Sequence, residues 1–306
     1  MPAANVAMGD SASNMLSWRL ALGALFVLVL AAWLWIDHNY TQPVPGVWLA
    51  VLGSLITVAA SGEVLRLLRS ATCRPSAPLV YFGNLLIVAS PWLALAWPDS
   101  PLGDLGWPLL ALTACFLLAL LEEVLRYERG VAEVTHRLAL TSFCLLYVGL
   151  SLSFVVQLRL VDGGAAGILL VATMIVVVKM SDIGAYTIGR LFGRHKLATE
   201  LSPKKTLEGV AGGFLFAWLA AWCCYRWLIP QNISPAPVWG WLVFAPVVTM
   251  AGILGDLTGS LLKRAAGQKD SSTWMPGFGG VIDLLDSPLL AAPVTYGCWL
   301  FGLLGR

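Results

Sequence analysis

The sequence predicts an all-α fold, that of a polytopic integral membrane protein with about nine transmembrane helices. The 306-residue chain is 58% hydrophobic and only 12% charged, with a mean hydropathy of +0.79. Roughly a quarter of the residues of a soluble domain are charged. A chain of this composition has more apolar side chain than a core of its length can bury, so lipid must solvate the rest.

Nine apolar runs approach the roughly 20 residues that a helix needs to cross a bilayer. They are residues 16–36, 46–62, 78–97, 105–121, 138–161, 165–180, 209–229, 239–262 and 288–304. Within the first run, the uninterrupted stretch from Leu20 to Ile36 follows Arg19, is long for the core of a signal peptide and lacks a convincing cleavage site after it, so we expect a retained span. Since no linker or repeat divides the chain, residues 1–306 are predicted to form a single transmembrane domain.

Lysine and arginine lie in alternate connections between these runs. The basic connections contain Arg66, Arg69 and Arg74, then Arg126, Arg129 and Arg137, and then the basic residues of 181–208 and 263–287. The intervening loops, at 37–46, 98–104, 162–164 and 230–238, contain neither residue. By the positive-inside rule the basic connections face the cytoplasm, which places the N-terminus inside and, with nine spans, the C-terminus outside.

Composition also excludes several classes of site. The six cysteines lie mostly within apolar runs and form no CxxC pair, so a disulfide or a cysteine metal site is not expected. The fourteen tryptophans suit the two membrane interfaces. No basic strip with interleaved aromatic residues is present, which argues against a nucleic-acid partner.

The C-terminal half, about residues 165–306, carries the polar motifs, and the densest of them lies between Gly252 and Pro288. Its charged residues are Asp256, Lys263, Arg264, Lys269, Asp270, Asp283 and Asp286. Charge is costly at bilayer depth, so such a cluster indicates a functional site. Carboxylates, lysines and a Gly-rich turn suit a divalent metal and a polyphosphate, which points to phosphoryl or nucleotidyl transfer.

Spacing within this segment suggests how the groups meet. Asp256, Ser260 and Lys263 are spaced i, i+4 and i+7, which places them on one face of a helix; the simpler interpretation is an Asp256–Lys263 pair that joins helices. Asp283 and Asp286 follow the turn that contains Gly277, Gly279 and Gly280, and glycines allow close backbone approach. Carboxylates are Mg²⁺ ligands, so Asp256 and Asp283 can hold the metal; alternatively, Asp283 and Asp286 only cap a helix.

A second motif runs from Ser181 to Gly209. Asp182 ends an apolar run, and Lys204 and Lys205 follow a proline. Lysines are mobile point charges for phosphates, although the topology alone would also demand cations at this position.

These two segments resemble the phosphatidate cytidylyltransferases, the CDP-diacylglycerol synthases. The residues that match the family signature are Ser260, Lys263, Arg264, Lys269, Asp270, Pro276, Gly277, Gly279, Gly280, Asp283 and Asp286. The preceding Gly255–Asp256 and the SDxGAYxxGRxFGxHKL…SPKKTxEG pattern from Ser181 to Gly209 match as well. Two family positions differ: Phe278 replaces a histidine and Leu284 replaces an arginine.

The resemblance implies a membrane nucleotidyltransferase of phospholipid biosynthesis that uses CTP, phosphatidic acid and Mg²⁺ at the bilayer. Its product would be CDP-diacylglycerol, with pyrophosphate released. The enzyme would lie in a bacterial-type plasma (inner) membrane with its site facing the cytoplasm, and the resemblance suggests a homodimer.

The resemblance also implies roles for individual residues. Asp256 and Asp283 would bind the metal, with Asp286 and Asp182 as supporting acids. The groups that would neutralise or contact phosphate are Lys263, Lys269, Lys204, Lys205, Ser260, Asp270, Gly279 and Gly280.

Two alternatives remain at this point. One is a CTP-dependent lipid-alcohol kinase, which would transfer the γ-phosphoryl group of CTP to a polyprenol or phytol. The other is a protein without this activity, either a catalytically inactive family member or a transporter; transporters commonly show paired repeats, which we do not find in this sequence.

Overall fold

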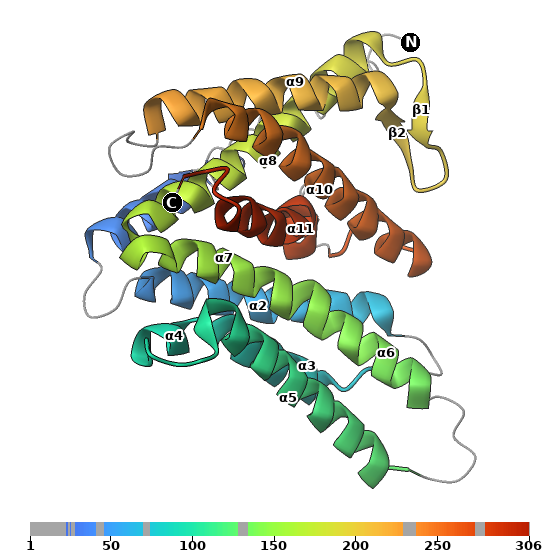
Figure 1. The fold of residues 1–306 in the computed structure, drawn as a ribbon. Coiled ribbons are helices and arrows are strands. Elements are labelled where there is room, and N and C mark those ends of the chain that lie inside the picture. Colours follow the sequence, from blue (N-terminus) through green and yellow to red (C-terminus); the bar gives the residue numbers. More distant parts are fainter. Residues whose placement is uncertain are drawn as a thin grey trace.

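The computed structural model describes residues 23, 25, 28–40, 46–69, 74–127, 134–228, 237–272 and 279–305, and the fold is almost entirely helical (Figure 1). Residues 28–39 form a helix. The helices that follow are α2 Val47–Leu68, α3 Ala77–Ala89, α4 Trp92–Ala96, α5 Gly103–Leu125, α6 Val134–Cys144, α7 Ser151–Leu160, α8 Ala165–Phe192, α9 Leu207–Cys223, α10 Val238–Ala265 and α11 Val281–Leu300. The π-helical segments η1 Leu145–Leu150 and η3 Cys224–Leu228 extend α6 and α9, the 3₁₀ turn η2 Val161–Gly164 precedes α8, and strands β1 Lys196–Ala198 and β2 Ser202–Thr206 form a hairpin.

The all-α membrane architecture is confirmed, but the predicted count of nine spans is not. In the described part of the chain, six helical segments are long and apolar enough to cross a bilayer. They are Val47–Leu68, Gly103–Leu125, Val134–Leu160, Ala166–Phe192, Leu207–Leu228 and Trp239–Ala265. The predicted run 78–97 is divided at Ser90 and Pro91 into α3 and α4, because proline cannot donate a helical hydrogen bond. Most of run 16–36 lies outside the described residues.

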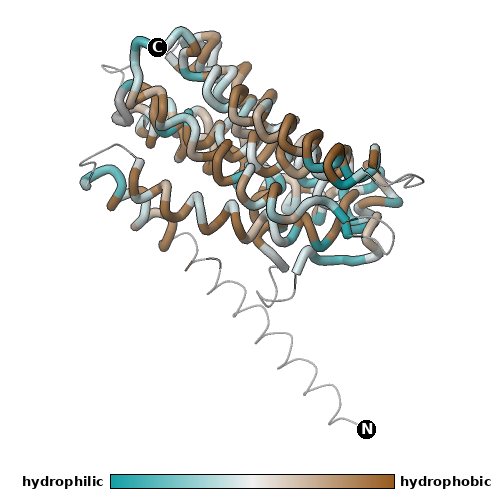
Figure 2. Tube along the Cα trace, turned by 90° about the horizontal axis from the view of Figure 1, so that it is seen from below, coloured by the Kyte–Doolittle hydropathy of each residue, from teal (hydrophilic) through white to brown (hydrophobic). Residues whose placement is uncertain are grey.

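Hydrophobic residues follow the length of the helices, and hydrophilic residues gather towards the ends of the bundle (Figure 2). The β1–β2 hairpin, the end of α10 and the start of α6 all lie at the right-hand end of the bundle in Figure 1. Connections that the sequence marks as basic are therefore on one side of the molecule, which is the arrangement that their alternation predicts.

Helix α8 continues past its predicted end at residue 180 and reaches Phe192. The extension packs closely on α9, because Gly184 and Gly212 face each other there: a Cβ on Gly184 would meet the carbonyl oxygen of Gly212 at 2.5 Å. Small residues allow two helices this approach. The hairpin that follows, with Lys196 opposite Thr206, ends where the Thr206 hydroxyl accepts a bond from the Gly209 amide and caps α9.

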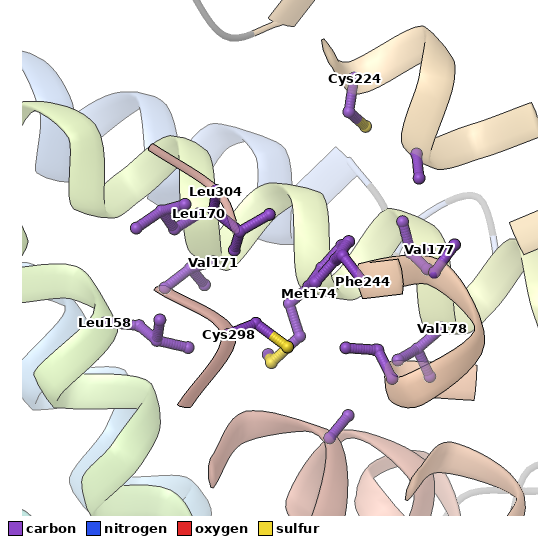
Figure 3. Packing of buried hydrophobic residues seen from close by; sticks show 14 of the residues in the cluster. Leu158, Leu170, Val171, Met174, Val177, Val178, Cys224, Phe244, Cys298 and Leu304 are labelled. Atoms are coloured by element: carbon purple, nitrogen blue, oxygen red, sulfur yellow. The ribbon is translucent and has the colours of Figure 1, made fainter. Parts of the chain in front are cut away.

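The main hydrophobic core lies in the C-terminal half, among α7, α8, α9, η3, α10 and α11 (Figure 3). Leu158, Met174 and Phe244 are fully buried in this core. A second buried cluster joins α2 and α3 to η1, α7 and α11, and includes Val64 and Ile282. Helix α11 therefore packs against both halves of the chain, which fixes the position of its first turn.

Candidate active site

The acids and lysines singled out in the sequence come from four elements that meet at the end of the bundle where α10 ends and α11 begins. Asp182 lies in α8, Lys205 in β2, Asp256 in α10 and Asp286 in α11. The contacts among these elements join the two sequence motifs into one site.

The first link is an ion pair between the hairpin and α10. Lys205 Nζ lies 2.6 Å from Asp256 Oδ2, and the two side chains are 23% and 36% exposed. The predicted face of α10 is present, but Asp256 pairs with Lys205 of the other motif, whereas the simpler interpretation paired it with Lys263. The reason is that the hairpin, which packs on α8 and α9, brings the Lys205 side chain within reach of α10, an arrangement that spacing along the chain does not reveal.

Lys263 instead reaches across to α11, where its ammonium group contacts Asp283 Oδ1. The other oxygen of Asp283 accepts three bonds, from the Ser271 amide at 2.8 Å, the Ser271 hydroxyl at 2.7 Å and the Gly280 amide at 2.9 Å. Asp283 therefore caps the first turn of α11 and holds Lys263 at the same time.

The two described glycines of the turn serve this capping arrangement directly. Gly279 has a φ of +83° and lies against the Asp283 carboxylate, and this backbone conformation favours glycine. At Gly280, a Cβ would collide with the Ser271 hydroxyl and the Glu63 carboxylate. The close approach predicted at Gly279 and Gly280 is thus made to protein carboxylates; Gly277 and Phe278 lie outside the described residues.

Asp286 is the most deeply buried acid of the two motifs, with 7% of its surface exposed. Its Oδ2 would lie 3.1 Å from a Cβ on Gly259, so α10 and α11 approach closely beside it. The Ser287 amide donates to Oδ1 at 2.7 Å.

Asp182 lies on the α8 side of the site. It forms an ion pair with Lys179 one turn earlier, at 3.6 Å, and it interacts electrostatically with Asp256 and Lys205. Lys179 also donates to the backbone carbonyl of Leu284 at 3.3 Å. Leu284 stands where the family has the arginine of its DRxD motif, and its backbone carbonyl accepts this hydrogen bond from Lys179 of α8.

Four further predicted residues are less enclosed. Lys204 is exposed on β2, Lys269 and Asp270 are exposed in the turn after α10, and Ser260 is partly exposed on α10. The structure does not bring Lys204, Lys269 or Asp270 into the buried part of the site, although all three lie at the same end of the bundle.

A metal site of three or more His, Cys, Asp or Glu side chains is not found among the residues that the structure describes. Asp256 and Asp283 each form an ion pair with a lysine, and no contact between the two acids is found among the described residues. The assignment of Asp256 and Asp283 as metal ligands therefore stays a prediction.

Glu63 of α2 is a residue of the site that the sequence analysis missed. It is 1% exposed and contacts Ser271 and the first amides of α11. Glu63 comes directly after the predicted run 46–62, so the sequence places it in the polar connection that follows the run. The available signal was an acid followed by the apolar residues Val64 and Leu65, which indicates that the helix continues past it.

Comparison with known proteins gives consistent matches. A sequence model of the cytidylyltransferase family matches residues 17–301. A Mycobacterium bovis protein named phosphatidate cytidylyltransferase is 30% identical over 264 residues, which cover 84% of this chain and 80% of that protein. Proteins of the same name from Thermotoga maritima (37% identity, 55% of this chain and 62% of that protein) and Haemophilus influenzae (38%, 42% and 44%) match shorter segments.

Proposed function

The chain belongs to the cytidylyltransferase family, and we propose that it transfers the cytidylyl group of CTP to phosphatidic acid, giving CDP-diacylglycerol and pyrophosphate. The relatives named phosphatidate cytidylyltransferase support this substrate pair. So does the matched length, which includes both polar motifs and most of the membrane helices.

One observation carries the proposal: two lysines and three aspartates from both motifs meet at the same end of the bundle. Lys205 pairs with Asp256, Lys263 pairs with Asp283, and Asp286 lies buried between α10 and α11. A purely structural set of ion pairs would not need a third buried acid beside two existing pairs. Mobile ammonium groups beside excess carboxylate suit a triphosphate together with a cation.

The reaction needs no protein nucleophile. An oxygen of the lipid phosphate attacks the α-phosphorus of CTP, forming a new P–O bond while the bond from the α-phosphorus to the bridging oxygen breaks and pyrophosphate leaves with that electron pair. We propose that Lys205 and Lys263 move from their carboxylate partners to the phosphate oxygens of CTP. Their task is to neutralise the charge that gathers on the leaving pyrophosphate.

The sequence-based assignment of Asp256 and Asp283 as metal ligands is untested, and we propose instead that Mg²⁺ binds at this site with Asp256 and Asp286 as its ligands. The supporting observation is that the Asp286 carboxylate lies against α10 beside Gly259, about one helical turn from Asp256, so that one cation could bind oxygens of both acids. Asp283, whose oxygens accept from a lysine, a hydroxyl and two amides, fits a supporting place better. When bound, Mg²⁺ would polarise the phosphoryl oxygens.

The site is proposed to face the cytoplasm from the inner membrane of a bacterial cell. The basic connections lie at the same end of the bundle as the site (Figure 1), and such connections are retained on the cytoplasmic side. Positive charge at that surface also concentrates an anionic lipid. A homodimer stays a prediction from the family resemblance.

The test uses the full-length protein purified in detergent, with phosphatidic acid, Mg²⁺ and CTP labelled at either the α- or the γ-phosphate. We expect the α-label in the lipid product and the γ-label in pyrophosphate. A γ-label in lipid, with CDP released, would instead establish the lipid-alcohol kinase reaction when a polyprenol is supplied. The same assay is run on Glu123→Gln as a control variant. This change removes an acid that pairs with Arg137 outside the site, so turnover should be retained.

A further inference from the structure

Glu63 joins the N-terminal half of the chain to the start of α11. Its Oε1 accepts a hydrogen bond from the Val281 amide at 2.9 Å, and its Oε2 accepts one from the Ile282 amide at 2.9 Å. The Ser271 hydroxyl lies 2.8 Å from Oε2. The first amides of a helix have no partner within the helix, and a buried carboxylate persists when such donors compensate for its lost hydration.

The site is shaped to admit this carboxylate. Gly280 leaves the space that Glu63 and Ser271 occupy, since a Cβ there would overlap both. Towards the exposed side, the Arg66 guanidinium lies 4.0 Å from Glu63 Oε1. Among the described contacts, Glu63 thus accepts bonds from neutral donors of α11 and the preceding turn, and Arg66 lies at longer range.

The Ser271 hydroxyl connects Glu63 to Asp283. It lies 2.8 Å from Glu63 Oε2 and 2.7 Å from Asp283 Oδ2. A hydroxyl has one hydrogen, so it donates to one carboxylate at a time while both constrain its position. Asp283 in turn contacts Lys263, which makes a continuous chain of contacts from α2 to the proposed phosphate-binding lysine.

We infer that Glu63 is a positioning residue for this site: it fixes the start of α11 and, through Ser271, the orientation in which Asp283 holds Lys263. The inference rests on the proposed function, because it assigns Glu63 an effect on CTP binding. A helix cap that served only stability would have no need of the shared hydroxyl. The consequence is that Glu63 and Ser271 should affect CTP binding through one common route.

The experiment compares the wild-type protein with Glu63→Gln, Ser271→Ala, the double variant and Glu123→Gln, all full length in detergent. It measures the Kd of CTP in the presence of Mg²⁺ by calorimetry and hydrogen exchange of the peptide that covers residues 279–285. Glu123→Gln is the matched control, because it removes a carboxylate bonded to Arg137 and tests general destabilisation without touching α11.

We expect Glu63→Gln to weaken CTP binding about tenfold to 100-fold, the effect of disturbing hydrogen bonds to a charged group. Exchange in residues 279–285 should rise, and the double variant should bind CTP about as weakly as Glu63→Gln alone. An unchanged Kd in Glu63→Gln, or effects of the two changes that simply multiply, would overturn the inference. Should Glu63→Gln fail to fold, Ser271→Ala decides alone, by weakening CTP binding or leaving it unchanged.

Failure of the proposed function is separable from failure of this inference. If the wild-type protein binds no CTP, the proposed function is wrong. Hydrogen exchange then decides the role of Glu63: the inference stands if Glu63→Gln and Ser271→Ala raise exchange at 279–285 by a common, non-additive amount, and it falls if the two increases are independent.

Discussion

Two of the groups of charged residues in the described part of the bundle, the Asp37–Arg159 pair and the active-site group, are built differently. Near the start of α2, Arg159 of α7 and Asp37 form a pair in which both side chains are essentially buried, with Nε and Oδ2 2.5 Å apart. The Leu49 amide donates to the same carboxylate at 3.1 Å. Glu63 lies on the same helix α2, 14 residues after Leu49 and so about 21 Å further along it, at ~1.5 Å per residue.

In the buried pair one cation, Arg159, meets one anion, Asp37, and the Asp37 backbone carbonyl accepts a further bond from Arg159 at 3.2 Å. The active-site group has an additional buried acid, Asp286, beside lysine pairs that are partly open to solvent. The difference teaches that burial of charged residues alone does not indicate a functional site. An excess of carboxylates beside lysines that are partly open to solvent is the better indication.

The largest effect is expected for Asp256→Asn. Removing one of the two proposed metal ligands should lower turnover of CTP and phosphatidic acid about 10³-fold, as when a main electrostatic contribution to the transition state is lost. The melting temperature in detergent should change little, because Asp256 is partly exposed. Turnover within tenfold of wild type would show that the acid group is structural, like the Asp37–Arg159 pair.

The converse is expected for Arg159→Met. The change leaves Asp37 buried without its cation, which costs about 3–5 kcal/mol of stability. Thermal unfolding in detergent should show a large decrease in melting temperature, while turnover per folded molecule stays near wild type. A double variant with Asp37→Leu should recover most of the stability, and a selective loss of turnover without loss of stability would contradict this assignment.

A smaller effect is expected for Lys205→Gln. Losing one charge-assisted contact to phosphate should raise the KM for CTP about tenfold to 100-fold, measured in steady-state assays at saturating lipid. Lys196→Gln, on the exposed neighbouring strand β1, is the matched control and should leave KM unchanged. Equal effects of the two changes would mean that only the general charge of the hairpin matters.

The smallest effect is expected for Arg126→Gln. Arg126 pairs with Glu122 one turn earlier, at 2.7 Å, but its side chain is 69% exposed. Such pairs contribute about 0.3–0.5 kcal/mol, so the melting temperature should fall by no more than a degree or two and turnover should not change. A loss comparable with that of Arg159→Met would remove the distinction between exposed and buried pairs.

Local patterns predicted much of the molecule. Apolar runs gave the membrane helices because bilayer thickness fixes their length, and the residues at 181–209 and 252–288 indicated the site because charge is costly at depth. Sequence reasoning extended α10 correctly around Asp256 and Lys263. It ended α8 too early at residue 180, since packing of Gly184 on Gly212 outweighs the local polarity of that segment.

The sequence by itself determined the helical membrane class and the identity of the acids and lysines that gather at one end of the bundle. It determined these because composition and spacing are local properties. Only the tertiary structure decided the partners: Lys205 with Asp256, Lys263 with Asp283, and Glu63 with the start of α11. Lys205 and Glu63 come from segments far from their partners in the sequence, while Lys263 and Asp283 lie on consecutive helices of one motif, and in each case packing of the helices brings the partners together.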